Sequence, residues 1–431
     1  MVDKGDRSRV IETLLSELTR QTADLICVML RPTTLAAFAA AAAASAVAAP
    51  PGALPPLAWA PLPHGTVKAE SWLHRQLSIQ SEGLSGAFPI FWPPVAQSEW
   101  AGGTDTEEDW FEIWPYVIQG YFPQAIILRD PAQLAQCEAW INHLLAVQAS
   151  YGTGWLGIDL AKRDGGMTYW PQWPVILSML AWREWGVALN GTEDARIVPA
   201  ILANLHNASG LLETRPMGRD WSGTRWQDFV FTVQAVMDCP TVPPSELPFL
   251  AQLAATAYEQ GKKNGIDWAS YYASTNGYTF PHEAVGSWDY LPHGVNNAMA
   301  AKGGAVTWRQ GLDPQGNVSS WTRDQNIMQW HGSPSGVFLA DECLAGTMPS
   351  KGSETCLVVE QLFSLNLVHE IQGDAYFAER AETIAYNALP SIGTKDMWSR
   401  VYLQQPNEIF AGHSEYQSGR AASARAPTSK P

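Results

Sequence analysis

The sequence predicts a mainly α-helical fold, a toroid in which successive antiparallel helix pairs form an (α/α) barrel. Segments with apolar residues at intervals of three and four follow one another along most of the chain, whereas strand signals are few. These helical segments come in pairs, joined by long connections rich in Gly and Trp. A stacked solenoid is the alternative, but a solenoid needs a constant repeat period, which the sequence lacks.

The predicted helices lie between about residues 61 and 406. The clearest is 133–148, where apolar residues from Leu134 to Leu145 recur at helical spacing. The next two predicted helices are separated by the turn residues Asn190 and Gly191, and Pro390 closes the last one. In chain order, the remaining predicted helices are 173–189, 195–205, 225–237, 246–263, 295–307, 356–371 and 375–389.

Composition excludes some partners. The chain has 431 residues, enough for one large domain or two ordinary ones. Its 27 Lys and Arg residues against 42 Asp and Glu residues give a formal net charge of −15. Nucleic acid and anionic lipid are therefore poor partners, because both need clustered basic residues. The 20 Trp residues are suited to stacking on sugar rings, and core packing is the alternative explanation for them.

The N-terminal region predicts secretion. Residues 29–48 have a short basic start at Arg31, an Ala-rich apolar run, and small residues at Ala46 and Ala48, as in a signal peptide. Residues 1–28 are then an over-extended start, and an Ala-rich helical linker is the alternative. No other segment is apolar enough to predict a membrane span.

Glycosylation sequons and cysteines agree with an extracellular protein. The sequons begin at Asn190, Asn207 and Asn317. The chain has five cysteines, and cleavage of the signal would remove Cys27. Four cysteines in so long a chain do not make a disulfide framework.

The connection 331–356 has the residues best suited to catalysis. Glu342 lies in a segment of small residues, and Glu354 and Cys356 stand at the start of a predicted helix. Cleavage of a glycosidic bond needs a carboxylic acid together with a nucleophile or base. A thiolate can be that nucleophile if a metal keeps it deprotonated, and Zn²⁺ accepts both carboxylate and thiolate ligands. For Glu354 alone, a favourable interaction with the helix dipole is the alternative.

Several ordered motifs resemble the β-L-arabinofuranosidase-like glycosidases, glycoside hydrolase family 127 and its relatives. Together they cover most of residues 61–409. The motifs are GLSG (83–86), EWAGG (99–103), PYVIQGYFPQA (115–125), GWLG (154–157), HGVN (293–296), GVFLADECLAG (336–346), ETC (354–356), GDAYFAERAETIAYNALP (373–390) and DMWSRVYLQQPNEI (396–409).

The resemblance implies a secreted glycosidase that hydrolyses β-L-arabinofuranosides in arabinose-containing glycans with retention of configuration. It implies an (α/α)₆ barrel at 61–409, with Glu342 as the general acid/base and Tyr402 as an active-site tyrosine. Glu354 and Cys356 match the first two protein ligands of the family's zinc. His293 resembles a sugar-contacting histidine. Two further substrate contacts are expected from their positions, at His331 beside the acidic segment and at Trp155 in the GWLG motif.

The sequence departs from the family pattern after the tyrosine segment. There the family has its nucleophile, a zinc-bound cysteine in a Cys-Cys pair, whereas this sequence has no cysteine after Cys356. Residues 411–431 are rich in Ala, Ser, Arg and Pro and are expected to be a disordered or out-of-frame tail, which would leave the barrel incomplete at its C-terminal end.

Two other hypotheses therefore stay open. The chain as written is a non-catalytic sugar-binding or inactive fragment, or it is a glycosidase of other specificity that uses Glu342 and Glu354 as a carboxylate pair. The pair requires carboxyl groups about 5–10 Å apart.

Overall fold

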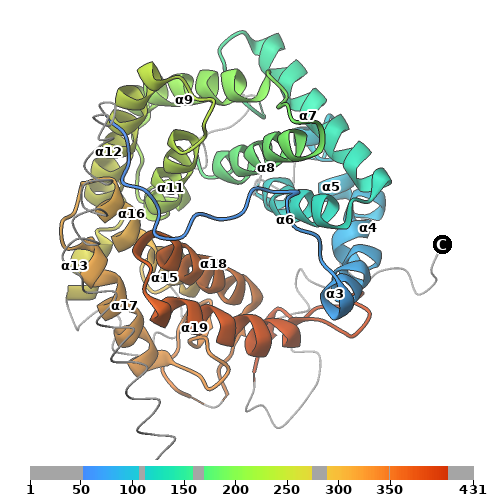
Figure 1. Ribbon diagram of the computed structural model, residues 1–431. Coiled ribbons are helices and arrows are strands. Elements are labelled where there is room, and N and C mark those ends of the chain that lie inside the picture. The colour runs from blue at the N-terminus through green and yellow to red at the C-terminus, as the bar shows by residue number, and fades with distance from the viewer. Residues whose placement is uncertain (1–51, 106–111, 159–168, 274–288, 349, 406–431) are drawn as a thin grey trace, which may run out of the picture. The chain divides into compact units, whose positions relative to one another are not determined.

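The computed structural model describes residues 52–105, 112–158, 169–273, 289–348 and 350–405 (Figure 1). These residues belong to one compact unit, Gly52–Pro431. The predicted start (1–28), signal peptide (29–48) and tail (411–431) lie outside the described residues. None of the helices in the described part is long and apolar enough to cross a membrane.

The unit consists mainly of helices. They are α3 (Ser71–Glu82), α4 (Leu84–Phe91), α5 (Pro93–Ala96), α6 (Ile113–Leu128), α7 (Pro131–Tyr151), α8 (Gln172–Asn190), α9 (Ile197–Thr214), α10 (Trp221–Thr224), α11 (Trp226–Met237), α12 (Leu247–Asn264), α13 (Trp268–Ala273), α15 (Gly294–Ala300), α16 (Gly303–Arg309), α17 (Gly316–His331), α18 (Thr355–Gln372) and α19 (Ala375–Thr383).

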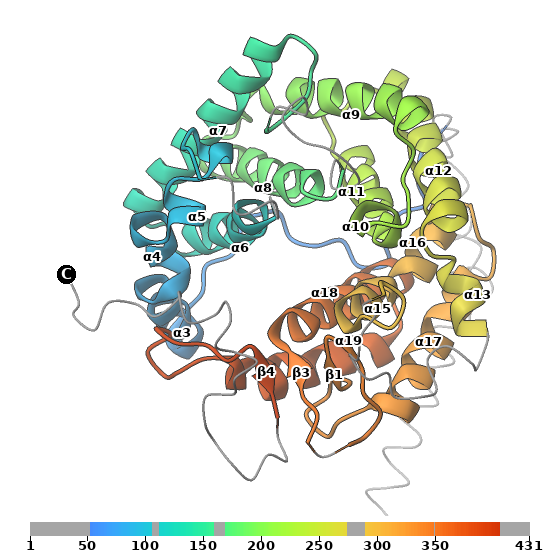
Figure 2. The ribbon, with the colours of Figure 1, turned by 180° about the vertical axis from the view of Figure 1, so that it is seen from behind.

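The helices form two layers of an α/α barrel, which confirms the predicted fold class. In the inner layer α6, α8, α11, α16 and α18 pack against one another in chain order (Figure 1). Each inner helix also packs on its outer partner, as α6 does on α7, α11 on α12 and α18 on α19. The inner position explains why nearly all of α11 is buried. The view from behind shows the same two layers (Figure 2).

The predicted helix boundaries follow from local chemistry where end signals are strong. The side chain of Asp130 accepts hydrogen bonds from the backbone N–H groups of Ala132 and Gln133, each at 2.9 Å, and so caps α7. Pro131 occupies the first helical position of α7. Gly152 ends it with a φ of 66°, a left-handed conformation that glycine adopts without steric cost.

Three predicted helices differ from the structure. The helix predicted at 195–205 is α9, which continues to Thr214. The helix predicted at 295–307 is two helices, α15 and α16, which are separated at Ala301 and Lys302. The helix predicted at 375–389 ends at Thr383 and continues as a π-helical turn, Ile384–Ala388, and a 3₁₀ turn, Leu389–Ile392.

Seven helices of the described residues were not predicted: α3, α4, α5, α6, α10, α13 and α17. The longest of these are α6 and α17. Helix α6 contains Pro123 and is apolar on most sides, so it lacks a clear amphipathic period. Helix α17 has few apolar residues.

A small sheet beside the inner layer positions the candidate site (Figure 2). Its strands are β1 (Ala340–Asp341), β2 (Cys343–Leu344), β3 (Ser353–Glu354) and β4 (Leu403–Gln404), in the order β2-β1-β3-β4. Strand β1 pairs antiparallel with β2 and parallel with β3, and β3 pairs antiparallel with β4. The sheet therefore brings together three segments that lie far apart in the sequence.

Candidate active site

Glu342 lies in the tight turn between β1 and β2. Its φ is 65°, in the left-handed region that non-glycine residues rarely adopt, and such strain is common at functional sites. The backbone carbonyl of Glu342 accepts a hydrogen bond from the N–H of Gly294 at 2.7 Å. A β-bridge also joins Cys343 to His293. The turn that carries Glu342 is thereby tied to the start of α15.

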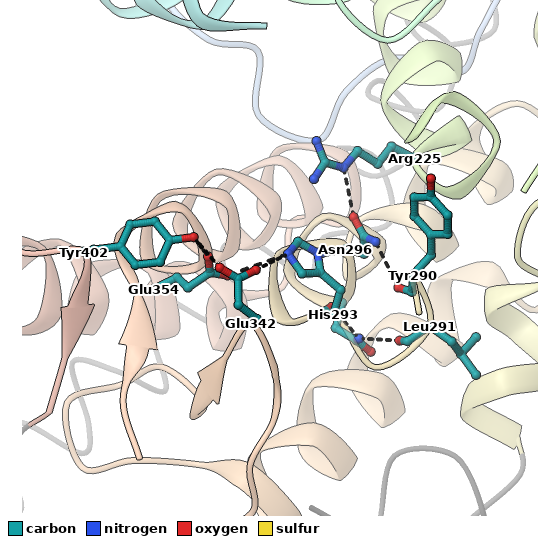
Figure 3. Close-up of polar contacts among 9 residues, drawn as sticks. Arg225, Tyr290, Leu291, His293, Asn296, Glu342, Glu354 and Tyr402 are labelled. Atoms are coloured by element: carbon teal, nitrogen blue, oxygen red, sulfur yellow. Dashed lines mark hydrogen bonds and ion pairs between the residues drawn. The ribbon is translucent and has the colours of Figure 1, made fainter. Parts of the chain in front are cut away.

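Glu354 occupies the N-cap position of α18, but its side chain does not cap the helix. Its side chain instead turns toward the carboxyl group of Glu342 and the hydroxyl of Tyr402 (Figure 3). The pairing of β3 with β4 sets Glu354 opposite Leu403, and the N–H of Thr355 donates to the carbonyl of Tyr402 at 2.8 Å. The side chain of Glu354 therefore makes no capping hydrogen bond, and the helix-dipole alternative stays a prediction.

Tyr402 bridges the two carboxyl groups. Its hydroxyl lies 2.6 Å from Oε1 of Glu342 and makes a second, short hydrogen bond to Oε1 of Glu354 (Figure 3). A hydroxyl has one proton, so it donates to one carboxylate and accepts from the other group in its protonated form. With the proton on Glu354, that carboxyl group donates to the hydroxyl of Tyr402, and the hydroxyl donates in turn to ionised Glu342.

The pKa values of the two carboxyl groups agree with a proton on Glu354 and an ionised Glu342. Burial and the neighbouring charge of Glu342 raise the pKa of Glu354 to about 8. Burial acts to raise the pKa of Glu342 as well, but hydrogen bonds from His293 and Tyr402 outweigh it and hold that pKa below its ordinary value. The two carboxyl groups thus carry one proton near neutral pH, a pattern typical of acid/base sites.

His293 completes the cluster. Its Nε2 lies 3.4 Å from Oε2 of Glu342 and 3.8 Å from Oε2 of Glu354. The other ring nitrogen, Nδ1, accepts a hydrogen bond of 3.4 Å from the backbone N–H of Asn296, so the ring proton lies on Nε2, toward Glu342. Burial lowers the pKa of His293, which keeps the imidazole neutral.

His293, Glu342 and Glu354 could hold a metal ion, because one ligand atom of each lies within 4.8 Å of the others. Oε2 of Glu354 is buried without a hydrogen-bond partner and so has free lone pairs for a cation. His293 fits less well, since metal-bound histidine donates its other N–H to an acceptor, whereas Nδ1 here faces a donor. Glu354 thus belongs to this group, Cys356 does not, and their joint ligation of zinc stays a prediction.

The structure places the other predicted residues as follows. Cys356 lies in the first turn of α18 and is exposed. His331 is fully buried, and its Nδ1 accepts from the N–H of Gly346 at 2.8 Å. Trp155 is buried and donates from Nε1 to the carbonyl of Ile158. His331 and Trp155 therefore contribute to the core, and their contact with a sugar stays a prediction.

The three sequons differ in accessibility. Asn190, at the end of α8, and Asn317, at the start of α17, are exposed. Asn207 is half-buried on α9, and its Nδ2, the atom that would carry a glycan, donates to the carbonyl of Thr153 at 2.9 Å. Glycosylation stays a prediction at all three positions.

Two residues at the site were not identified from the sequence, Arg225 and Asn296. Arg225 precedes α11 and donates from Nε to Oδ1 of Asn296 at 2.9 Å (Figure 3). Arg225 stands between Trp221 and Trp226 and was predicted as the first residue of a helix, which gave no sign of a role at the site. Asn296 lies inside the HGVN motif, of which only the histidine was singled out.

No family model matches the sequence, and no curated protein matches it either. Comparison with solved structures is informative. A GH127 β-arabinofuranosidase aligns over 80% of this chain and 56% of its own, with a TM-score of 0.53 and 14% identity. The chain has the fold of family 127 glycosidases. A GH127 β-L-arabinofuranosidase from Geobacillus stearothermophilus T6 aligns over 79% of this chain and 58% of its own, with a TM-score of 0.54 and 16% identity.

A third structure, described as a glycoside hydrolase, covers 83% of this chain and 57% of its own, with a TM-score of 0.52 and 13% identity. The chain therefore spans less than three fifths of the length of each of these three structures. At these identities the similarity establishes the fold, and activity follows only from the site.

Proposed function

We propose that this chain is the catalytic domain of a secreted, retaining glycoside hydrolase that acts on arabinose-containing glycans. The observation that carries the proposal is the cluster of Glu342, Glu354 and Tyr402, in which two carboxyl groups hydrogen-bond to one hydroxyl (Figure 3). Such a cluster keeps one carboxyl protonated and the other ionised near neutral pH, as general acid/base catalysis at a glycosidic bond requires.

Glu342 is the general acid/base of this proposal. Its side chain is 20% exposed, whereas that of Glu354 is 2% exposed, so Glu342 is the carboxyl that a substrate can reach. The proton held on Glu354 reaches Glu342 through the hydroxyl of Tyr402 when the leaving oxygen is protonated. The Nε2–H of His293 faces Glu342 and fixes the orientation of its carboxylate.

Zinc is the cofactor of this proposal, with Glu354 and Cys356 as the ligands that the sequence resemblance implies. Bound zinc would keep a cysteine thiol deprotonated as a nucleophile. Cys356 opens α18 two residues after Glu354, so both side chains extend from the same end of that helix. The family's cysteine nucleophile has no counterpart after Cys356 in this sequence.

The carboxylate pair is a second candidate mechanism, and the spacing of the two acids favours it. One oxygen of Glu342 lies within 4.8 Å of one oxygen of Glu354. Retaining glycosidases hold their two carboxyl groups about 5–5.5 Å apart, whereas inverting enzymes need about 6.5–9.5 Å to admit a water molecule. The separation lies below the range of inverting enzymes, and because the side chain of Glu354 is only 2% exposed, Glu342 is the carboxyl that meets the substrate in this mechanism too.

The test is hydrolysis of p-nitrophenyl β-L-arabinofuranoside by the full chain, with the anomeric configuration of the first-formed sugar followed by NMR. The proposal expects L-arabinose released as the β-anomer. Release of the α-anomer would reject retention. Binding of L-arabinose without any hydrolysis would reject the enzyme and support the sugar-binding alternative.

A further inference from the structure

Arg225 is a buried cation that makes no ion pair with the described residues. The residue is 5% exposed, and no carboxylate in the described part of the chain lies within ion-pair distance of it. The neighbouring Asp228 is engaged elsewhere, at 2.8 Å from Nζ of Lys302. The carboxyl groups of Asp228, Glu354 and Glu360 lie near enough to attract the guanidinium, but none of them contacts it. Among the described residues, the paired N–H groups of this buried cation therefore have no carboxylate partner.

Arg225 is held rigidly by its surroundings. Its guanidinium lies over the rings of Trp170 and Trp221, at 4.7 and 4.3 Å from their centroids. Nε donates to Oδ1 of Asn296, whose Nδ2 in turn donates to the carbonyl of Tyr290 at 2.9 Å (Figure 3). These contacts use the faces of the guanidinium and one of its N–H groups. The two terminal nitrogens make no hydrogen bond to the described residues.

A series of side-chain contacts connects the guanidinium of Arg225 with the catalytic cluster. Asn296, its hydrogen-bond acceptor, also donates its backbone N–H to His293, and Trp221 packs edge-on against the His293 ring at 5.5 Å. His293 in turn contacts Glu342. One connected set of side chains, Arg225–Asn296–His293–Glu342, therefore joins the guanidinium to the acid/base group.

A carboxylate is the ligand that this arrangement fits best. A guanidinium is planar, stays charged at every physiological pH and presents paired N–H groups that match the two oxygens of a carboxylate. The two tryptophans hold that plane before any ligand binds, which lowers the entropy cost of binding. A sugar hydroxyl could accept one hydrogen bond, but it would match neither the charge nor the paired N–H groups of Arg225.

We propose that Arg225 binds a carboxylate of the substrate, so that the glycan hydrolysed here carries an acidic sugar at or next to the bond that is cleaved. This inference rests on the proposed function, since it takes the ligand to be a glycan. It makes Arg225 a specificity-determining residue, with Trp170, Trp221 and Asn296 as the residues that position it.

The test compares binding of D-galacturonate and D-galactose to the full chain by calorimetry. These sugars differ only in whether C6 is a carboxylate or a hydroxymethyl group. We expect the wild-type chain to prefer D-galacturonate by at least about tenfold, as a charge-assisted paired hydrogen bond would give. Arg225→Met should abolish the preference and leave the affinity for D-galactose within about twofold, a difference of less than about 0.5 kcal/mol.

Two further variants test whether the preference depends on the paired geometry of Arg225 and on Arg225 itself. Arg225→Lys keeps the charge without the paired geometry and should retain only part of the preference, which also covers the case in which Arg225→Met does not fold. Arg219→Met removes an exposed arginine and should leave the preference intact. Equal binding of both sugars by the wild type, absence of binding, or an unchanged preference in both Arg225 variants would overturn the inference.

Hydrolysis and binding measured on the same protein test the proposed function and this inference separately. Hydrolysis of a glycoside without any preference for D-galacturonate would reject the role of Arg225 and keep the glycosidase. A preference that depends on Arg225, without hydrolysis of any glycoside, would reject the glycosidase and show that the site binds acidic sugars.

Discussion

The hydroxyl of Tyr402 lies 2.6 Å from Oε1 of Glu342, although the two residues are 60 positions apart in the sequence. The same hydroxyl contacts Glu354, so one side chain connects the accessible carboxyl group with the buried one. This connection allows the two acids to share a proton, and the acid/base assignment depends on it.

Glu342→Gln tests the acid/base assignment most directly. The amide cannot transfer a proton, so we expect kcat for an arabinofuranoside to fall by about 10²–10⁴-fold, the contribution typical of general acid/base catalysis. Initial rates with a p-nitrophenyl glycoside measure the effect. Glu379→Gln, at an exposed position on α19, is the matched control and should leave the rate unchanged. Wild-type turnover in Glu342→Gln would remove Glu342 from this role.

Tyr402→Phe should shift the pH dependence of kcat/KM. The tyrosine hydroxyl donates its one proton to ionised Glu342 and thereby lowers the pKa of that carboxyl group. Its removal raises the pKa of Glu342, so the basic limb, which reports loss of the proton from the general acid, should move to higher pH. Tyr386→Phe, at an exposed tyrosine, is the control. A limb that stays in place or moves to lower pH would contradict the shared-proton arrangement.

Glu354 should make folding stability depend on pH. Its pKa is about 8 in the folded chain against an ordinary value of 4.5, so the folded state binds more proton between these pH values. The stabilisation is complete below about pH 4.5 and is lost as pH rises to about 8, with a slope of at most about 1.4 kcal/mol per pH unit.

Urea unfolding of the wild type and of Glu354→Gln between pH 5 and about pH 8 measures this contribution. The wild type should lose stability relative to the variant as pH rises, because the amide of the variant does not titrate. Parallel stability curves for the two proteins would show that Glu354 is ionised throughout the range.

Cys356→Ser should reduce bound zinc if Cys356 is a ligand. Elemental analysis of the purified chain after exposure to one equivalent of Zn²⁺ gives the occupancy. A hydroxyl replaces a thiolate poorly as a zinc ligand, so occupancy should fall together with activity. Cys239→Ser, at a buried cysteine after α11, should bind zinc as the wild type does. Full occupancy in Cys356→Ser would leave the carboxylates as the metal donors.

Lys302→Met should destabilise the barrel. Nζ of Lys302 is fully buried, lies 2.8 Å from Asp228, and donates to Ser364 at 3.1 Å, so it joins α11 to α18. Its removal leaves the charge of Asp228 buried and unpaired, which costs about 3–5 kcal/mol. Urea unfolding measures the loss, and the double variant with Asp228→Asn should recover part of it. Additive effects of the two substitutions would show that the pair is not coupled.

The sequence predicted the helices best where their end signals are local. Helices α7, α8 and α18 begin and end within about two residues of the predicted bounds, because Asp130, Gly191 and Gly373 stand at their ends. The break between α15 and α16 was not predicted, since it lies at Lys302, whose partners are on other helices. A local pattern does not report such tertiary contacts.

At the candidate site too, residues in local motifs were predicted, and residues placed by tertiary contacts were not. Glu342, Glu354, His293 and Tyr402 were each expected from motifs, and the structure brings these four together. His331 was expected at the site from its place in the chain, but it is buried beneath the segment that carries Glu342. Arg225 was not expected, because nothing in its sequence neighbourhood indicates that it lacks a carboxylate partner.

By itself, therefore, the sequence determined the helical class, the pairing of helices and the acidic motifs, because periodicity and end signals act over a few residues. Only the tertiary structure decided which carboxyl group holds the proton and that Arg225 makes no ion pair with the described residues. Those properties depend on burial and on distances between β3, β4 and α15, which strand pairing and helix packing set across long separations in the chain.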